Sequence, residues 1–238
     1  MSAAVSSAML LAAGQGIRMR PLTLTRPKPL IEVAGKALID YAFDRLRQAG
    51  VSHAVVNVHY LAEQIEAWAK RQTGMTIAIS DERTELLDTG GGITLALPHL
   101  GVAPFFVLNS DSFWIDGARS ALKRLQDRWD DAAMDCLLLL CPLPKAVGYD
   151  GEGDFVLDRQ DRATRRKDAV GEALVYAGGY LVHPRLFRES PGGKFSMNVL
   201  WDKAIAQGRL FGLVHEGLWF HVGTPESIAL AEAAFREA

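Results

Sequence analysis

Short hydrophobic runs alternate with amphipathic stretches through the first 140 residues of the chain. This alternation is typical of strands joined by crossover helices, and it predicts an α/β fold with a mostly parallel sheet. The hydrophobic runs predict strands near residues 8–13, 53–58, 75–80, 104–109 and 134–140. The helical spacing of apolar residues predicts helices over residues 38–49, around 61–68 and over 119–129.

Beyond Cys141 the pattern changes to shorter β segments. Residues 147–158 resemble a hairpin, residues 173–183 resemble a strand interrupted by glycines, and residues 217–222 predict a further strand. A last helix is expected from Pro225, with Thr224 as its N-cap. Because no repeat or linker separates these parts, we expect residues 1–238 to form one domain in which residues 141–238 close over residues 1–140.

The charge balance and the cysteines narrow the class of protein. The 26 Lys and Arg against 28 Asp and Glu give a net charge of -2, which offers no overall reason to expect nucleic acid or a membrane as partner. The N-terminus lacks a cationic start and Gly14 breaks its apolar run, so neither a signal peptide nor a spanning helix is expected. Cys136 and Cys141 flank an apolar run that predicts a buried strand. A reduced cytoplasm fits these features.

The stretch LAAGQGIRMRPLTLTRPKPL, residues 11–30, brings glycines, cations and prolines together directly after a predicted strand. Met19 stands where a dinucleotide-binding loop has its third glycine, and no Gly-Lys-Ser or Gly-Lys-Thr sequence closes a Walker loop. Gly14 and Gly16 either form a simple tight turn or let backbone N–H groups approach phosphate oxygens. Arg18 can bind an anion through two N–H groups and Lys28 through a point charge, so we expect the loop to bind phosphates.

Six motifs in this order resemble those of the sugar-1-phosphate nucleotidyltransferases. They are LAAGQGIRMRPLT (11–23), PKPLIEVAGKALI (27–39), LLDTGGGI (86–93), FVLNSD (106–111), GEGDFVL (151–157) and HVGTPESI (221–228). The resemblance implies a Rossmann-like, GT-A-type mixed sheet flanked by helices, with a nucleotide-binding half over residues 1–140 and a smaller, β-rich sugar-binding half over residues 141–238. Within the family, the chain resembles the short uridylyltransferases that act on N-acetylmuramate 1-phosphate, and similar short chains are guanylyltransferases acting on mannose or heptose 1-phosphate.

The resemblance implies that a sugar 1-phosphate oxygen attacks the α-phosphorus of a nucleoside triphosphate and releases pyrophosphate. A phosphate monoester has a second pKa of about 6, so the attacking group needs no general base. The implied catalytic residues are Arg18, Lys28 and Asp111, with Arg18 on the triphosphate and Lys28 near the α-phosphate. The implied nucleotide contacts are Ala12, Ala13, Gly14, Gly16, Ile17, Arg18, Lys28, Glu82, Thr89 and Gly90.

Asp111 directly follows a predicted strand, at the sheet edge where ligands of open α/β folds bind. The resemblance makes it a ligand of Mg²⁺, which Mn²⁺ could replace, since Mg²⁺ takes one or two carboxylates and substrate phosphates. Relatives carry an aspartate where this chain has His221, and an imidazole suits Mg²⁺ less well. His221 is therefore either a second metal ligand, a contact to water or phosphate, or a buried structural histidine.

The expected sugar contacts come mainly from the second half of the chain: Asn109, Gly148, Gly179 and Asn198. The alternative for each glycine is a β-bulge, and for Asn198 a helix cap. A guanylyltransferase is the competing enzyme, and a non-catalytic nucleotide-sugar sensor is the competing binding protein. Met19 disfavours an NAD-dependent oxidoreductase. The expected partners are thus a nucleoside triphosphate and a sugar 1-phosphate, and a homo-oligomer is compatible with the sequence.

Overall fold

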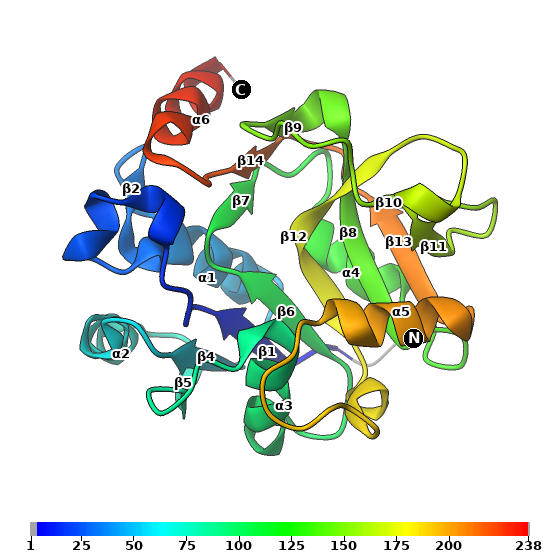
Figure 1. The fold of residues 1–238 in the computed structure, drawn as a ribbon, viewed down its shortest axis with the longest axis horizontal. Coiled ribbons are helices and arrows are strands. Elements are labelled where there is room, and N and C mark those ends of the chain that lie inside the picture. The colour runs from blue at the N-terminus through cyan, green and yellow to red at the C-terminus, as the bar shows by residue number, and fades with distance from the viewer. Residues whose placement is uncertain (1–3, 238) are drawn as a thin grey trace.

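A mixed β-sheet forms the centre of the computed structural model, which describes residues 4–237 (Figure 1). Within these residues the sheet has nine strands: β1 (Ser7–Leu11), β4 (His53–Val58), β5 (Thr76–Asp81), β6 (Phe105–Asn109), β8 (Cys136–Pro142), β10 (Phe155–Leu157), β11 (Ala163–Arg165), β12 (Leu174–Val182) and β13 (Leu210–Val214). Their order is β11-β10-β12-β6-β1-β4-β5, and β8 pairs with both β12 and β13. The sheet therefore runs through both halves of the chain.

The strands of the first half are parallel, as the sequence pattern predicts. β1 pairs in parallel with β4 and β6, and β4 pairs in parallel with β5. β12 then runs antiparallel to β6 and β8, which makes the sheet mixed. The register of β12 shifts between Tyr176 and Tyr180, where Gly178 has φ +77°. The predicted interruption of this strand by glycines is confirmed, because a positive φ is readily adopted only by glycine.

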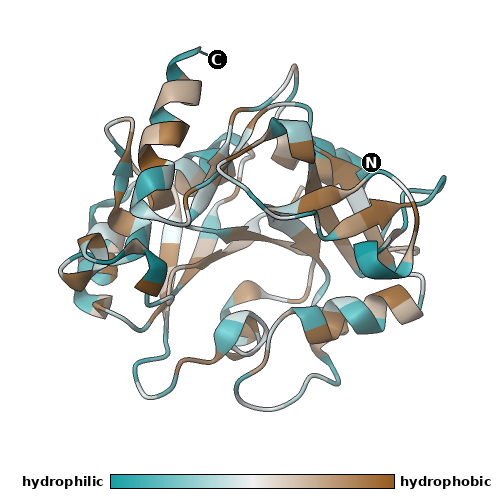
Figure 2. Ribbon diagram, turned by 45° about the horizontal axis from the view of Figure 1, so that its top comes forward, coloured by the Kyte–Doolittle hydropathy of each residue, from teal (hydrophilic) through white to brown (hydrophobic). Residues whose placement is uncertain are grey.

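Helices cover both faces of the sheet. They are α1 (Leu38–Gln48), α2 (Ala62–Arg71), α3 (Asp88–Leu100), α4 (Ala121–Arg128), α5 (Asn198–Ala206) and α6 (Pro225–Glu237). Alternate residues of β1 point to opposite faces: Ala8 and Leu10 pack with apolar residues of α1, α2 and α4, whereas Met9 packs with those of α3 and α5. Figure 2 shows hydrophobic stretches along the central strands, between helices whose surfaces carry hydrophilic residues.

A small three-stranded sheet joins the last helix to the body of the molecule. It contains β7 (Ser112–Trp114), β9 (Ala146–Val147) and β14 (Trp219–His221), in the order β7-β14-β9. The rings of Phe113 and Phe220 stack at 4.6 Å, and the ring of Tyr41 in α1 stacks on Phe113 at 4.2 Å. Phe235 of α6 meets these rings edge-on. This apolar cluster packs α6 against the small sheet, and Figure 1 shows α6 next to β14.

Shorter elements complete the described residues. β2 (Glu32–Val33) and β3 (Lys36–Ala37) form a two-stranded antiparallel sheet. The 3-10 helices are η1 (Ile17–Met19), η2 (Leu22–Leu24), η3 (Lys28–Leu30), η4 (Leu143–Lys145), η5 (Arg166–Asp168) and η6 (Pro184–Phe187). Among the described helices, none is both long and apolar enough to cross a membrane. Cys136 and Cys141 are buried in β8 as free thiols, as predicted.

The predicted hairpin over residues 147–158 is wrong. β9 and β10, which would be its two strands, belong to different sheets, and β10 instead pairs with β11. The turn of the real hairpin uses two aspartates rather than glycines. Asp158 Oδ1 accepts hydrogen bonds from the backbone N–H groups of Gln160 and Arg162, and Asp161 adopts a φ of +63°. Aspartates stabilise such turns by accepting backbone hydrogen bonds. The prediction instead followed Gly151 and Gly153, which suggested a turn earlier in the chain.

A buried carboxylate ties β8 to two arginines from distant parts of the chain. Asp135, 6% exposed, accepts a hydrogen bond from Arg185 Nε at 2.7 Å and forms an ion pair with Arg209 Nε at 2.9 Å. Burial by itself would raise the pKa of Asp135, but the hydrogen bonds from Arg209 and Arg185 outweigh it and hold that pKa below its ordinary value. A carboxyl with a depressed folded-state pKa stabilises the fold above its unfolded pKa, and this contribution is lost as the pH falls through the folded value.

We therefore expect Asp135→Asn to lower the free energy of unfolding at pH 7 by about 2 kcal/mol, the size of a charge-assisted hydrogen-bond pair. The difference from the wild type should stay constant from pH 7 to about 5 and narrow only below about pH 4. Urea unfolding across this range measures it. Glu189→Gln is the control, because Glu189 is 80% exposed and its ion pair with Lys203 is screened by solvent. A pH-independent difference would contradict the role assigned to the Asp135 charge.

Candidate active site

The loop after β1 takes its shape from Gly16, which has φ +61°. A Cβ added to Gly16 would lie 2.9 Å from Thr23 Cγ2 and 3.0 Å from Lys28 Cβ, so only glycine lets the loop pack against the proline-rich segment. Thr23 Oγ1 also donates a hydrogen bond to Gly16 O at 2.8 Å. Met19 is fully buried in the cluster beneath α6. The residue that departs from the dinucleotide fingerprint thus anchors the loop in an apolar core.

A buried chain of hydrogen bonds holds the other side of the same loop. Ala12 N donates to Asn57 Oδ1 at 2.7 Å, and Asn57 Nδ2 donates to Glu82 Oε1 at 2.6 Å. The second oxygen of Glu82 accepts from Leu87 N at 3.0 Å. Glu82, predicted as a nucleotide contact, is 1% exposed with both oxygens bonded to protein. It therefore positions the loops on both sides and does not offer a free carboxylate to the cleft.

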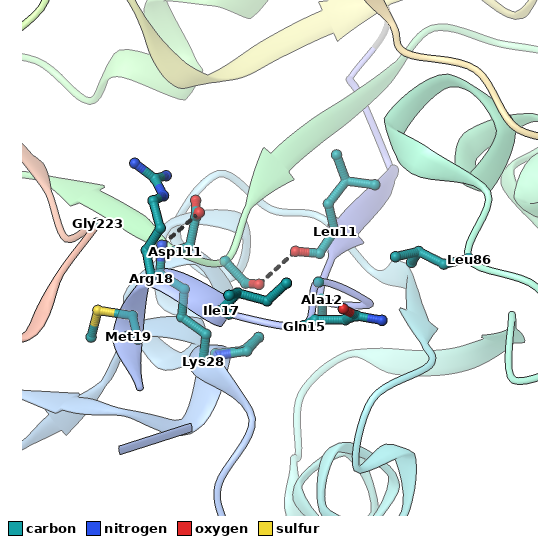
Figure 3. A pocket seen from close by; sticks show the side chains of 14 residues that line it. Leu11, Ala12, Gln15, Ile17, Arg18, Met19, Lys28, Leu86, Asp111 and Gly223 are labelled. Carbon is teal, nitrogen blue, oxygen red and sulfur yellow. Dashed lines mark hydrogen bonds and ion pairs between the residues drawn. The ribbon is translucent and has the colours of Figure 1, made fainter. Parts of the chain in front are cut away.

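Lys28 and Asp111 meet although 83 residues separate them in the sequence. Lys28 Nζ lies 2.9 Å from Asp111 Oδ2, with the lysine side chain 10% and the aspartate side chain 40% exposed. Lys28 begins η3 and is flanked by Pro27 and Pro29, which limit the freedom of the backbone that carries it. Asp111 follows β6, next to β1 in the sheet. Figure 3 shows Arg18 on the same side of the cavity as this pair.

The charges around Asp111 keep its carboxylate ionised. Burial opposes ionisation, but the charge and hydrogen bond of Lys28, with smaller effects of His221 and Arg18, outweigh it and lower the pKa of Asp111. Burial also lowers the pKa of His221, because it disfavours the imidazolium more than Asp111 favours it. At neutral pH the site therefore presents an ionised aspartate, a neutral imidazole and two cations.

These residues line a cleft at the carboxyl edge of the parallel strands, where three adjoining cavities share Leu11. The loop compartment, about 380 Å³, is lined by residues including Gly14, Gly16, Ile17, Arg18, Lys28 and Asp111. The middle compartment, about 350 Å³, is lined by residues including Ala13, Asn57, Glu82, Leu86, Thr89, Asp111 and Lys194. The aromatic compartment, about 260 Å³, is lined by residues including Asn109, Asp154, Phe155, Arg165, Tyr176, Tyr180, Asn198 and Trp201.

The glycines of the LLDTGGGI motif lie at the start of a helix. Gly90, Gly91 and Gly92 lie in the first turns of α3. The N–H groups of Gly90 and Gly91 donate to Phe195 O, and a Cβ on Gly90 would overlap the Phe195 ring. These glycines are therefore required for packing, and Gly90 does not line any of the three compartments within the described residues. Thr89 does line the cleft, where its Oγ1 accepts from Met197 N at 2.9 Å.

The four predicted sugar contacts divide into two pairs. Asn109 and Asn198 both line the aromatic compartment. Gly148 and Gly179 do not, and each has a packing reason to be glycine. A Cβ on Gly148 would lie 2.7 Å from the carbonyl oxygen of His221, and a Cβ on Gly179 would lie 3.0 Å from Leu108 Cδ2. Neither Gly148 nor Gly179 therefore lines the compartment in which the sugar contacts were expected.

His221 lies beside the cleft without lining its loop compartment. Gly223 lines it instead, and a Cβ on Gly223 would lie 2.7 Å from His221 Nε2 and 3.5 Å from Arg18 Nη1. His221 pairs with Ser112 across β14 and β7, one residue from Asp111. Asp111 Oδ1 has no hydrogen-bond partner among the described residues.

These residues fit an ion that takes few protein ligands. Within residues 4–237 no group of three or more His, Cys, Asp or Glu side chains is placed to hold a metal. Asp111 and His221 could therefore supply at most part of a coordination shell. A single carboxylate with few other protein ligands suits Mg²⁺, which keeps waters and substrate phosphates as ligands, better than it suits an ion enclosed by protein.

Several residues of the cleft were missed at the level of sequence. Asn57 had the clearest signal in the sequence, because it is a polar residue inside the apolar run HAVVNV. Gly223 of the motif HVGTPESI and Ser110 of the motif FVLNSD also line the loop compartment, although neither was predicted as a site residue. Lys194 and Arg165 stand in stretches with no sequence signal beyond their charge, and only the fold brings them to the cleft.

A glycine loop facing a Lys–Asp pair, at the carboxyl edge of the parallel strands of an α/β sheet, is an arrangement suited to bind a nucleotide. Residues 7–149 match the model of the Nucleotidyl transferase family, and the chain belongs to that family. It is 48% identical to the N-acetylmuramate alpha-1-phosphate uridylyltransferase of Caulobacter vibrioides, over the whole of both chains. It is 36% identical to the enzyme of that name from Neisseria meningitidis, over 95% of this chain and 96% of the other.

A more distant relative carries the name of a sugar-1-phosphate nucleotidyltransferase, and two solved structures share the fold. A mannose-1-phosphate guanylyltransferase catalytic subunit of Danio rerio is 30% identical over 92% of this chain and 61% of its own length. The inositol-1-phosphate CTP transferase of T. maritima superposes with a TM-score of 0.78 at 18% identity, covering 97% of this chain and 96% of the other. A UDP-glucose pyrophosphorylase complexed with UDP-glucose gives 0.77 at 17%, covering 98% and 99%. The expected mixed, helix-flanked sheet is confirmed by these folds.

Proposed function

We propose that this chain transfers a uridylyl group from UTP to N-acetylmuramate 1-phosphate, forming UDP-N-acetylmuramate and pyrophosphate. The observation that carries the proposal is the placement of Arg18, Lys28 and Asp111 around one cleft in a chain 48% identical, along its full length, to a protein named for that reaction. The shared mixed sheet and the family match support the same class of chemistry.

The three compartments suggest where each part of the substrates binds. The triphosphate belongs in the loop compartment, which residues 14–16 and Arg18 line and where backbone N–H groups and a guanidinium can bind phosphate oxygens. The base belongs in the middle compartment beside Leu86 and Thr89. The sugar belongs in the aromatic compartment, where aromatic rings and the side chains of Asn109 and Asn198 can contact a hexose. Asp111 lies between the loop and middle compartments, beside the phosphates.

The reaction joins one phosphate oxygen of the sugar 1-phosphate to the α-phosphorus of UTP. As this P–O bond forms, the bond between the α-phosphorus and the α,β-bridging oxygen breaks, and pyrophosphate leaves with that electron pair. The attacking monoester is largely a dianion at neutral pH and carries its own nucleophilic electron pair. The protein therefore needs to align the reacting groups and neutralise charge, rather than remove a proton.

Lys28 and Arg18 are suited to that neutralisation. The Lys28 ammonium is fixed by Asp111 at 2.9 Å, so little reorganisation is needed when charge gathers on the α-phosphate. Arg18 has no ion-pair partner among the described residues, and its guanidinium is free to hold the leaving pyrophosphate. Lys28 would thus stabilise charge on the α-phosphate, and Arg18 would stabilise charge on the leaving pyrophosphate.

We propose Mg²⁺ as the cofactor, with Mn²⁺ as a substitute. Asp111 is the protein residue that would hold it, through the oxygen not bonded to Lys28, and His221 is the candidate for a second contact. When bound, such an ion supplies positive charge to the phosphate oxygens. Because burial lowers the pKa of His221, its imidazole is neutral, and Asp111 supplies the negative charge that would attract the ion.

Pyrophosphate release with four nucleoside triphosphates and a panel of sugar 1-phosphates tests the proposal. The panel contains N-acetylmuramate, N-acetylglucosamine, glucose, mannose and heptose 1-phosphates, each assayed with Mg²⁺ and with Mn²⁺. We expect turnover only with UTP, and the highest kcat/KM with N-acetylmuramate 1-phosphate. A preference for GTP with mannose or heptose 1-phosphate would establish the guanylyltransferase alternative. Nucleotide binding without turnover in any combination would establish a sensor.

A further inference from the structure

The aromatic compartment contains a partly buried cation that has no role in the transfer of the uridylyl group proposed above. Arg165 is the only Lys or Arg among the described residues that line it, and its side chain is 17% exposed. The remaining charged residues on this wall are Asp88 and Asp154. A hexose ring and its hydroxyls carry no charge, so they would give this cation no ionic partner.

The guanidinium of Arg165 is held in place on several sides. Arg165 Nε donates to Asp202 Oδ1 at 2.8 Å, and Nη2 donates to Asn198 Oδ1 at 3.0 Å. Its guanidinium carbon lies 4.8 Å from the centre of the Phe155 ring and 5.8 Å from that of Trp201. Phe155 is also the cross-strand partner of Arg165 between β10 and β11. The fold has therefore already ordered this side chain, so a ligand that binds it loses little conformational entropy in doing so.

The donors of Arg165 are not all satisfied by the protein. Nη1 has no hydrogen-bond partner among the described residues, which leaves two N–H groups for a ligand. Asp202 is 62% exposed, so solvent screens its attraction for Arg165 and the positive charge is only partly cancelled. An ordered, partly neutralised guanidinium with free N–H groups is suited to bind a carboxylate or a phosphate.

The position of Arg165 favours a carboxylate. The phosphate of the sugar must lie near Lys28 and Asp111, which line the loop compartment, and that compartment shares only Leu11 with the aromatic one. N-acetylmuramate differs from N-acetylglucosamine by a lactyl ether on its sugar ring, which ends in a second anion away from the phosphate. We propose that Arg165 binds this lactyl carboxylate and thereby selects N-acetylmuramate 1-phosphate over other hexose 1-phosphates. This inference rests on the proposed function.

Arg165→Met tests the inference through two different sugars. For N-acetylmuramate 1-phosphate we expect KM to rise about 10- to 100-fold, the effect of losing a charge-assisted hydrogen bond, with kcat changed much less. N-acetylglucosamine 1-phosphate lacks only the lactyl ether, so its inhibition constant as a competitor should stay within about twofold. Arg165→Lys keeps the charge without the planar fork and should give an intermediate KM. If Arg165→Met lowers the melting temperature strongly, the lysine variant decides the question.

Arg166→Met is the matched control. Arg166 is the next residue, is 43% exposed and lies 3.8 Å from the carboxylate of Glu152. It lines none of the three compartments, so its loss should leave both constants unchanged. Equal weakening of both sugars by Arg165→Met would show that Arg165 binds a shared group such as the phosphate, and would overturn the inference. Unchanged binding of both would overturn it too. Failure of the wild-type protein with N-acetylmuramate 1-phosphate would instead refute the proposed function.

Discussion

Replacement of Lys28 by methionine is expected to lower kcat/KM about 1000-fold, the upper range for removing one preorganised charge-stabilising donor. Lys28 Nζ is 2.9 Å from Asp111 Oδ2, and its side chain is 10% exposed, so water cannot readily take the place of the ammonium. The loss should fall mainly on kcat, because the charge on the reacting phosphate is largest in the transition state. Steady-state rates of pyrophosphate release measure both constants.

Arg26→Met provides the control for the Lys28 variant. Arg26 belongs to the same proline-rich segment, but its side chain is 52% exposed and pairs with Glu32 on the surface. Its replacement should change kcat/KM by less than about twofold, because exposed ion pairs contribute little. Retention of more than about a tenth of wild-type activity by Lys28→Met would contradict the assigned role, since that loss corresponds to only about 1.4 kcal/mol.

Asp111→Asn should lower kcat by about 1000-fold or more and also abolish the normal response to Mg²⁺. The variant keeps the size of the side chain but removes the negative charge that attracts a divalent ion. It also removes the ionic partner of Lys28, so the lysine is no longer fixed at the reacting phosphate. Rates measured across a Mg²⁺ titration separate the two effects. A metal-binding defect raises the Mg²⁺ concentration needed for half-maximal rate, whereas a misplaced Lys28 lowers the rate at saturating Mg²⁺.

Asp81→Asn is the control for the loss of a carboxylate at this sheet edge. Asp81 ends β5, in the parallel part of the sheet that also contains β6, the strand before Asp111, but its side chain is 51% exposed and pairs with Arg83. It should leave the Mg²⁺ response and kcat unchanged within about twofold. An Asp111→Asn enzyme with a wild-type Mg²⁺ titration would remove Asp111 from the proposed metal site.

Much of the fold follows from local sequence pattern. The predicted strand over residues 53–58 matches β4 at both ends, and the other predicted strands of the first half differ from β1, β5, β6 and β8 by a few residues. These strands are continuous apolar runs separated by amphipathic helices, the clearest signal of a parallel sheet. The second half was harder to predict. Its strands are short, and their partners, such as β14 beside β9, are distant in the sequence.

The phosphate end of the site was predictable, and the sugar end less so. Arg18, Lys28 and Asp111 belong to compact motifs on neighbouring parts of the sheet, and the structure places all three on the loop compartment. The two glycines predicted to contact sugar turn out to pack against Leu108 and the His221 backbone. A glycine signals close approach of another group, but the sequence does not say whether that group is a ligand or the protein itself.

Residues whose roles depend on contacts with other segments of the chain had the weakest signals in the sequence. Glu82 was predicted to contact the nucleotide, yet its hydrogen bonds run to Asn57 and Leu87 and organise the loops around the cleft. Arg165 stands in a stretch of the sequence rich in Arg and Lys, and the pairing of β10 with β11 places it beside the ring of Phe155. Such roles depend on tertiary contacts between segments 5 to 37 residues apart. The pattern of charged residues along the sequence does not predict these contacts.

Phosphorus NMR of the purified protein with UTP, N-acetylmuramate 1-phosphate and Mg²⁺ tests the central claim of direct uridylyl transfer. We expect the phosphomonoester signal of the sugar to disappear together with the three signals of UTP. In their place should appear the two coupled phosphates of a nucleotide-sugar and one equivalent of pyrophosphate. Release of UMP with an unchanged sugar 1-phosphate, or a spectrum in which both substrates persist although UTP is bound, would contradict the claim.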